Sequence, residues 1–223
     1  MAYVLSDIVV RVQQRVRDSS YDDDEITNYL NDTINDVYNE YRLPFMEVTE
    51  DYTLTQNVAD ITNGGGLPDD FVQAIDLTLT TLGIESKLAF VDYRELDQYR
   101  PDAADTTRWP ANVPTQWYKF GETINVFPVP NTAYTVTLRY YKSPTMLADA
   151  TDVPDIPAQF VEMLVMGAAY RVLQVKDNYD QAGVLQNKYD ELLDKLVMKY
   201  SRPQTGSAIR MRMNTYALGK RFF

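Results

Sequence analysis

The segment from Pro157 to Val175 constrains the fold most, because apolar residues occupy nearly its whole length. Only Gln159, Glu162, Arg171 and Gln174 interrupt it. The fixed φ and missing N–H of its first residue suit the first position of a helix. A helix that is apolar around its circumference must be covered on more than one side. We therefore expect a buried helix, covered by the rest of the chain or by neighbouring copies that pack around it.

A second helix is predicted directly after the first, with Asp177 or Asn178 as its cap. Its spacing is amphipathic. The apolar face contains Ala182, Leu185, Tyr189, Leu192, Leu193, Leu196 and Tyr200. One such face cannot cover the first helix on all sides, so the subunit-packing surface is predicted on the first helix. Its candidate residues are Phe160, Leu164, Gly167, Ala168, Tyr170 and Arg171.

Two more helices are predicted near the N-terminus. Ser6 is the expected cap of the first, which runs from Asp7 to about Asp18. The second follows the acidic run 22–25 and ends before Pro44, since the residue preceding proline avoids the α region. Acids at a helix start are favoured by the helix dipole. A calcium loop would need alternating ligands, a glycine and a distal glutamate, which this run lacks.

The pattern changes to short alternating segments between about Met46 and Pro144. Gly121-Glu122 has the form of a two-residue hairpin turn. The predicted strands include residues 47–55, 58–61, 75–79 and 134–140. The glycine run 64–66 is read as a flexible loop, because the lysine and hydroxyl residue of a phosphate loop do not follow it.

The order of these elements predicts an α+β fold. Both chain ends form a helical bundle, with an inserted antiparallel β domain and an extended C-terminal arm. The expected parts are the N-terminal helices of the bundle (1–45), the inserted β domain (46–150), the C-terminal helices of the bundle (151–202) and the arm (203–223).

Composition argues against most enzyme classes. The chain has no cysteine and no histidine, which removes thiol nucleophiles, histidine bases and most transition-metal sites. Two carboxylates could still act in glycoside hydrolysis, and the acids 149, 152 and 155, or 69 and 70, lie close in sequence. They read as loop and helix-start residues, so we expect no enzyme, cofactor or metal site. No signal peptide or membrane span is predicted.

Charge divides the chain into two unequal regions. The net charge is −11, but residues 201–223 hold five basic residues and no acid, so the remainder carries −16. An acidic body does not favour specific binding of nucleic acid. Alternation within 209–214 predicts an extended arm that can add to another chain's sheet. The candidate docking residues are Ile209, Arg210, Met211, Arg212, Met213, Tyr216, Leu218, Lys220, Arg221, Phe222 and Phe223. The alternative is a frayed tail.

Several short sequence motifs follow one another along the chain in an order that suggests a protein family. They are Leu67-Pro68-Asp69-Asp70-Phe71, Val91-Asp92-Tyr93-Arg94-Glu95-Leu96, Gly121-Glu122-Thr123-Ile124-Asn125-Val126-Phe127-Pro128, Leu138-Arg139-Tyr140-Tyr141 and Val153-Pro154-Asp155-Ile156-Pro157, followed by Gly167-Ala168-Ala169-Tyr170-Arg171. In this order the chain resembles the head-to-tail adaptor (connector, head-completion) proteins of tailed bacteriophages, from residue 6 to about 200.

The resemblance implies a structural protein of the virion, located at the head–tail interface and assembled in the host cytoplasm. It implies a homo-oligomeric ring, commonly of twelve copies, beneath the portal protein. The arm would dock into the portal, a tail or nozzle protein would bind the other side, and DNA would pass through without specific binding. The competing interpretation is a carbohydrate- or receptor-binding β module, since Trp109, Trp117, Tyr118 and other aromatic residues fall in the β region.

Overall fold

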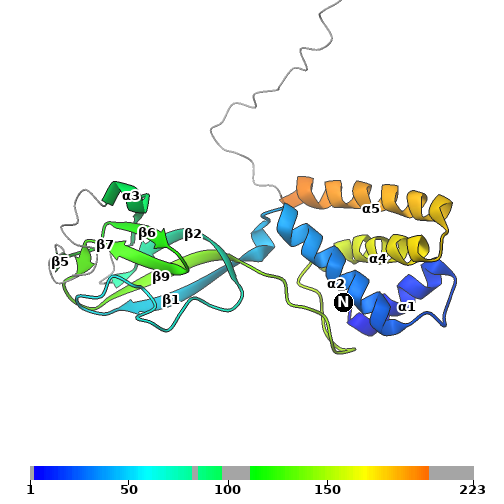
Figure 1. The fold of residues 1–223 in the computed structure, drawn as a ribbon, viewed down its shortest axis with the longest axis horizontal. Coiled ribbons are helices and arrows are strands. Elements are labelled where there is room, and N and C mark those ends of the chain that lie inside the picture. The colour runs from blue at the N-terminus through cyan, green and yellow to red at the C-terminus, as the bar shows by residue number, and fades with distance from the viewer. Residues whose placement is uncertain (1–2, 82–84, 97–110, 201–223) are drawn as a thin grey trace, which may run out of the picture.

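A computed structural model describes residues 3–81, 85–96 and 111–200. Figure 1 shows the described chain as two bodies along its longest axis, a helical bundle and a β domain. Each body has its own cluster of buried apolar residues. The α+β prediction is confirmed. The predicted docking arm lies outside the described residues.

Four long helices form the bundle, from both ends of the described chain. They are α1 (Leu5–Val16), α2 (Asp23–Glu40), α4 (Val161–Val175) and α5 (Tyr179–Tyr200). Short 3₁₀ turns, η1 (Pro44–Met46) and η5 (Ala158–Phe160), lie where the chain leaves and re-enters the bundle. The predicted cap of α2 is confirmed, since the Asp22 side chain accepts a hydrogen bond from the Asp24 N–H at 3.0 Å.

Two predicted helix starts are wrong. Ser6 lies inside α1, which begins at Leu5. A side-chain cap is unnecessary there because the Leu5 and Ser6 N–H groups donate to the carbonyls of Asp152 and Ala150, at 2.8 and 3.1 Å. Pro157 precedes the turn η5, and the α-helical hydrogen bonds begin only at Val161.

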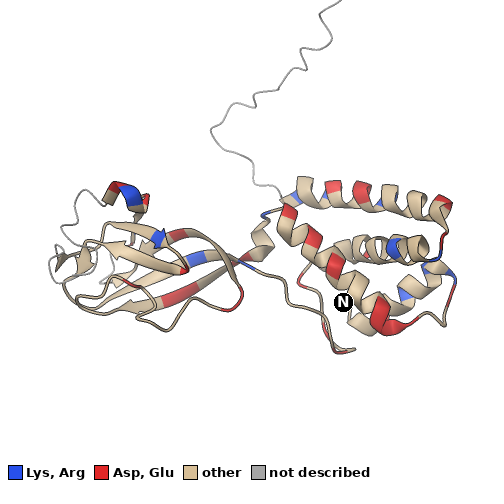
Figure 2. Cartoon of the chain, in the orientation of Figure 1, with Lys and Arg blue, Asp and Glu red and all other residues tan. Residues whose placement is uncertain are grey.

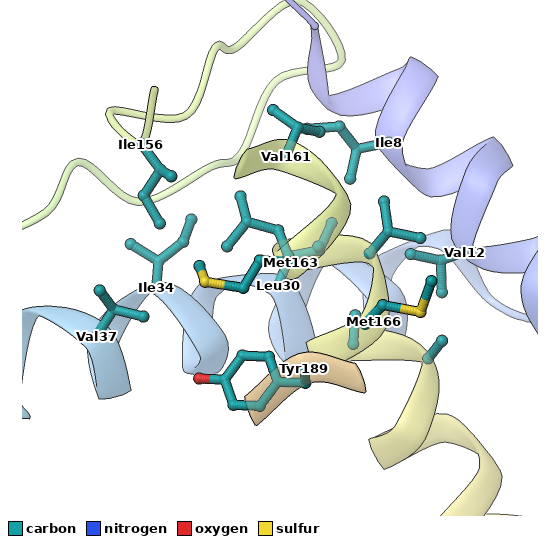
Figure 3. Packing of buried hydrophobic residues seen from close by; sticks show 14 of the residues in the cluster. Ile8, Val12, Leu30, Ile34, Val37, Ile156, Val161, Met163, Met166 and Tyr189 are labelled. Carbon is teal, nitrogen blue, oxygen red and sulfur yellow. The ribbon is translucent and has the colours of Figure 1, made fainter. Parts of the chain in front are cut away.

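The apolar helix α4 lies between α1, α2 and α5. Figure 3 shows Met163 and Met166 of α4 among side chains of the flanking helices, including Ile34 of α2 and Tyr189 of α5. Ten of the fifteen residues of α4 are buried within this single chain. Of the two expected sources of cover, the rest of the chain provides it, because three helices of the same chain bury α4; the prediction of a subunit-packing surface along this helix is wrong for its buried residues.

The β domain is built on a four-stranded sheet in the order β1-β9-β2-β3. These strands are β1 (Glu47–Leu54), β9 (Tyr134–Lys142), β2 (Phe71–Leu79) and β3 (Ser86–Lys87). A second sheet has the order β4-β6-β7, with β4 (Ala89–Phe90), β6 (Gln116–Phe120) and β7 (Thr123–Phe127). The helix α3 (Tyr93–Leu96) lies beside it, and β5 (Ala111–Asn112) pairs with β8 (Val129–Pro130).

The clearest sequence patterns of the β region are confirmed. Alternate residues of β9 from Tyr134 to Tyr140 are buried, as their period of two predicted. The hairpin of β6 and β7 turns at Gly121, whose φ of +59° suits a glycine-first turn. The long pairings are antiparallel, whereas β4 with β6 and β5 with β8 are short parallel pairs.

Two expectations for the β region were wrong. Residues 58–61 form only one isolated bridge, Asp60 to Asn125, because the Asp60 carboxylate instead accepts hydrogen bonds from the N–H groups of Thr62 and Gly64 in a turn. In β2, Asp76 was expected on the polar face, yet it is buried. A register shift between Ala74 and Asp76 accompanies this burial, and Lys87 pairs with the Asp76 carboxylate at 3.0 Å.

Replacement of Gly167 by alanine should destabilise the bundle by about 1–3 kcal/mol through overpacking. A Cβ at this position would lie 2.5 Å from Thr33 Cγ2 and 3.2 Å from Tyr189 Cδ2. Thr33 is fully buried and cannot move aside cheaply. Chemical denaturation of the Gly167→Ala variant would measure the change.

The matched control is Gly183→Ala in α5, where the added Cβ would meet nothing within 4 Å. That variant should be more stable than the wild type by about 0.5–1 kcal/mol, because alanine is the better helix former. Equal effects of the two substitutions would contradict the close packing of α4 against α2 and α5.

Candidate interaction surfaces

Three of the five acids that could have formed a catalytic pair have structural partners. The Asp152 carboxylate accepts hydrogen bonds from the N–H groups of Ala148 and Asp149, both at 2.8 Å, and its pKa is lowered by them. Asp155 pairs with Lys142 at 2.9 Å, and Asp70 accepts a hydrogen bond from the Tyr140 hydroxyl at 3.0 Å. Within the ranges that the structure describes, no group of three acidic side chains could hold a metal ion.

A groove of about 600 Å³ separates α2 from α5. Its lining residues are Asp36, Asn39, Glu40 and Tyr41 on one side and Tyr189, Asp190, Leu193 and Asp194 on the other. Burial raises the pKa of the Tyr41 hydroxyl, and so do its hydrogen bond to Glu40 and the negative charges of Glu40, Asp194 and Asp190. Carboxylates of both helices thus converge on one side of the bundle.

Arg171 fixes the inner end of this groove. Its Nη1 donates to Thr33 Oγ1 at 2.6 Å and to the Gly167 carbonyl at 2.9 Å, and its other terminal nitrogen pairs with Asp36. Thr33 Oγ1 in turn donates to the Tyr29 carbonyl at 2.7 Å. A planar guanidinium with several donors can satisfy all these acceptors at once, which the single ammonium of a lysine cannot do in the same geometry. The arginine ties α4 to α2.

A second groove, of about 380 Å³, lies on the other side of α5, next to α1. It is lined by Arg15, Arg17, Leu173, Asp180, Gln181, Val184 and Leu185. The neighbouring turn between α4 and α5 exposes apolar side chains: Val175 is 61% and Tyr179 is 65% exposed. Lys176, at the end of α4, pairs with Asp18 just after α1 and thereby closes this end of the bundle.

The β domain carries an aromatic surface. Phe90 and Phe120 remain 62% and 57% exposed, and the Phe90 ring lies 4.8 Å from the Trp117 ring. A groove of about 410 Å³ beside Phe90 is lined by Gln73, Ala74, Ile75, Phe90, Trp117 and Lys119, whereas Phe120 does not line it. The rings of Tyr93 and Phe120 also stack, 4.7 Å apart. This surface is apolar enough to bind a partner or a sugar ring.

The residues predicted for subunit packing divide into two classes. Phe160, Leu164, Gly167 and Ala168 are buried by the chain's own helices and have no surface left for a neighbour. Tyr170 and Arg171 are partly exposed beside the groove between α2 and α5, and a subunit contact there stays a prediction. The predicted arm residues 209–223 and Trp109 lie outside the described residues.

The charged flanks of α5 were missed by the sequence reasoning, which grouped all its polar residues on one face. At about 100° per residue, Asp190 and Asp194 fall on one flank, whereas Lys188, Lys195 and Lys199 fall on the other. Counting each charge sign separately around the helix would have revealed this separation. In Figure 2, acidic residues are visible on both α2 and α5.

Comparison with known proteins gives one family. A family model described as SU10 adaptor protein matches residues 4–212. The match spans the bundle and the β domain alike. No curated protein matches the chain. Among the described helices, none is long and apolar enough to span a membrane.

The ion pair between Asp18 and Lys176 should make the bundle sensitive to acid. The hydrogen bond from Lys176 is the largest of several influences that lower the Asp18 pKa from 3.8 to about 2. A lowered folded-state pKa stabilises the fold above the unfolded-state value, and this contribution disappears as the pH falls toward the folded-state value. The stability of Asp18→Asn should therefore fall less than that of the wild type between about pH 5 and pH 2.

Urea unfolding at a series of pH values would measure this difference. The matched control is Asp69→Asn, an exposed carboxyl group in the β domain with no ion pair among the described residues. If both variants follow the wild-type pH profile, the ion pair contributes nothing to stability.

Proposed function

The chain belongs to the SU10 adaptor protein family, and we propose that it is a structural head-to-tail adaptor in the virion of a tailed bacteriophage. In this proposal, copies form a ring, commonly of twelve, that docks to the portal protein and links the capsid to the tail. The ring leaves a channel for DNA, which passes without specific binding. A tail or nozzle protein binds the opposite side, and assembly takes place in the host cytoplasm.

The single observation that supports this function best is the extent of the family match. It covers both structural bodies, so the proposal applies to the whole architecture and not to one common module. The structure adds support because surface charge and exposed aromatic residues dominate its candidate surfaces, whereas its close-set carboxylates have structural partners. These features suit a protein that binds other proteins, without a cofactor or catalytic centre.

The C-terminal arm is the proposed portal-docking element. Residues 209–223 combine alternating apolar and basic residues with two terminal phenylalanines. An extended segment of this kind can add to the edge of a partner's sheet, where main-chain hydrogen bonds give affinity and alternate side chains give specificity. The basic side chains would also favour an acidic docking surface.

The acidity of the body supports the proposed channel. The region before residue 201 carries a net charge of −16. Carboxylates facing a channel would repel the phosphate backbone and so prevent a passing genome from binding to the wall. At physiological ionic strength this repulsion acts over about 8 Å, so only acids at the wall itself would contribute.

The aromatic surface of the β domain supports a second candidate function, binding of a carbohydrate or a receptor. Phe90 is exposed at a groove and Phe120 is exposed outside it, and aromatic rings can bind the apolar face of a sugar. In an adaptor, the same surface would instead contact a tail or nozzle protein.

Deletion of residues 207–223 should abolish attachment to the portal while leaving the fold intact. The described residues, all before this segment, already form two buried clusters, so we expect their packing to persist without it. Co-sedimentation with purified portal rings would measure attachment, and circular dichroism would report the fold. Undiminished attachment would place the docking surface elsewhere.

A double substitution in the arm tests how much charge contributes to docking, apart from the length and the apolar residues of the arm. Arg210→Gln with Arg212→Gln keeps the length and the apolar residues of the arm but removes two charges. This variant should attach more weakly than the wild type at low salt, and the difference should shrink as the salt concentration rises, because screening removes the attraction that the two arginines supply.

Replacement of Phe90 and Phe120 by serine tests the alternative function. If the adaptor function is correct, neither the wild type nor this variant should be retained on immobilised glycans. Retention of the wild type with loss in the variant would support the carbohydrate-binding function. Thermal unfolding of the variant serves as the control, since both rings are largely exposed and their loss should leave the fold intact.

A further inference from the structure

Two opposite flanks of α5 differ in their unpaired charges. Asp190 and Asp194 face the groove next to α2, and both are exposed. Lys188 lies more than about 120° around the helix from them, on the flank that carries Val184 next to α1. The separation is partial, since Glu191 pairs with Lys195 on the lysine side and Asp180 lines the groove next to α1.

The acidic flank comprises Glu40 of α2 together with Asp190 and Asp194 of α5. None of these three carboxylates has an ion-pair partner among the described residues, whereas the fourth acid of the groove, Asp36, pairs with Arg171. Three unpaired carboxylates around one groove repel each other and favour the approach of a cation. Leu193 and Tyr189 form the apolar floor of the same groove.

The basic flank lies beside the groove that Asp180 also lines, and its unpaired basic residues are Arg17, at the end of α1, and Lys188 of α5. Both side chains are exposed and neither has an ion-pair partner in the described part of the chain. Arg15 lies nearby and pairs with Glu162. Exposed Val184, 56% accessible, and Leu185 add an apolar component to this flank. Both flanks therefore combine unpaired charge with apolar groups.

We propose that the acidic flank of one copy binds the basic flank of the next copy, and that this pairing is the contact between successive subunits. The inference rests on the ring in the proposed function and assigns its interface. The two flanks lie on opposite sides of α5, so each copy offers one of each. A contact between two different surfaces is heterologous, and it closes into a ring when the rotation between copies allows.

Charge complementarity explains why the occupant is a second copy. Each chain has a net charge of −11, so copies repel one another overall. Screening limits this repulsion to about 8 Å at physiological ionic strength, and the charges at the contact then determine whether two copies associate. Opposite charges on the two flanks supply a local attraction in one orientation and disfavour contacts between like flanks.

Charge reversal tests the pairing. The acid-flank variant carries Asp190→Lys and Asp194→Lys, and the base-flank variant carries Arg17→Glu and Lys188→Glu. Each variant alone presents the same charge on both flanks, so its self-association should weaken by about tenfold or more. An equimolar mixture should form rings again, because opposite charges then meet at every contact between alternating copies. Mass photometry and negative-stain microscopy, with and without portal, would count the rings.

The matched control is Asp69→Lys with Glu122→Lys, which adds the same charge at exposed sites of the β domain. This control should assemble like the wild type. Rings in either single variant at wild-type concentrations, or failure of the mixture to recover, would overturn the assigned interface. The same two results are expected if the C-terminal arm of another copy, and not its helical bundle, binds the acidic flank. Absence of rings in the wild type would instead overturn the proposed ring itself.

Discussion

The burial of α4 by three helices of the same chain is the packing on which the rest of the structure depends. Its central residues, such as Met163 and Ala168, are completely buried, and they contact helices from both ends of the sequence. The β domain is inserted between the two pairs of helices that make these contacts. Closing the bundle therefore fixes both points where the β domain joins it, and the ion pair of Lys142 with Asp155 reinforces that junction.

One buried polar residue in this packing, Thr33, is linked to the surface of the bundle through Arg171. Thr33 is fully buried and polar, and it lies where Gly167 lacks a side chain. Arg171 reaches the threonine hydroxyl from one turn further along α4 and continues to Asp36 at the groove. Because the glycine allows the close approach and the arginine satisfies the polar groups, α2 and α4 are held in one register. The acidic groove thus has a rigid inner end.

Periodicity predicted those parts of the fold that are determined by local pattern. The alternation in β9, the hairpin at Gly121 and the cap at Asp22 depend on neighbours in sequence, and all three were predictable. The cap of α1 was not, because backbone carbonyls of Ala150 and Asp152 supply it from a distant segment. The burial of Asp76 likewise depends on a register shift and on Lys87 across the sheet. Contacts between distant segments decide such features, and a single sequence does not reveal them.

The same limit explains why the apolar helix was misread as a subunit contact. The apolar surface of a helix indicates how much of the helix must be buried, but not whether the same chain or another copy buries it. Since α1, α2 and α5 already provide the cover, the apolar surface that is left to join copies lies outside this core, at exposed residues such as Val184 and Met198. In the proposed ring, the charged groups at the contact would make association depend on orientation and salt. The core of the bundle is complete within one chain, so its packing does not require other copies.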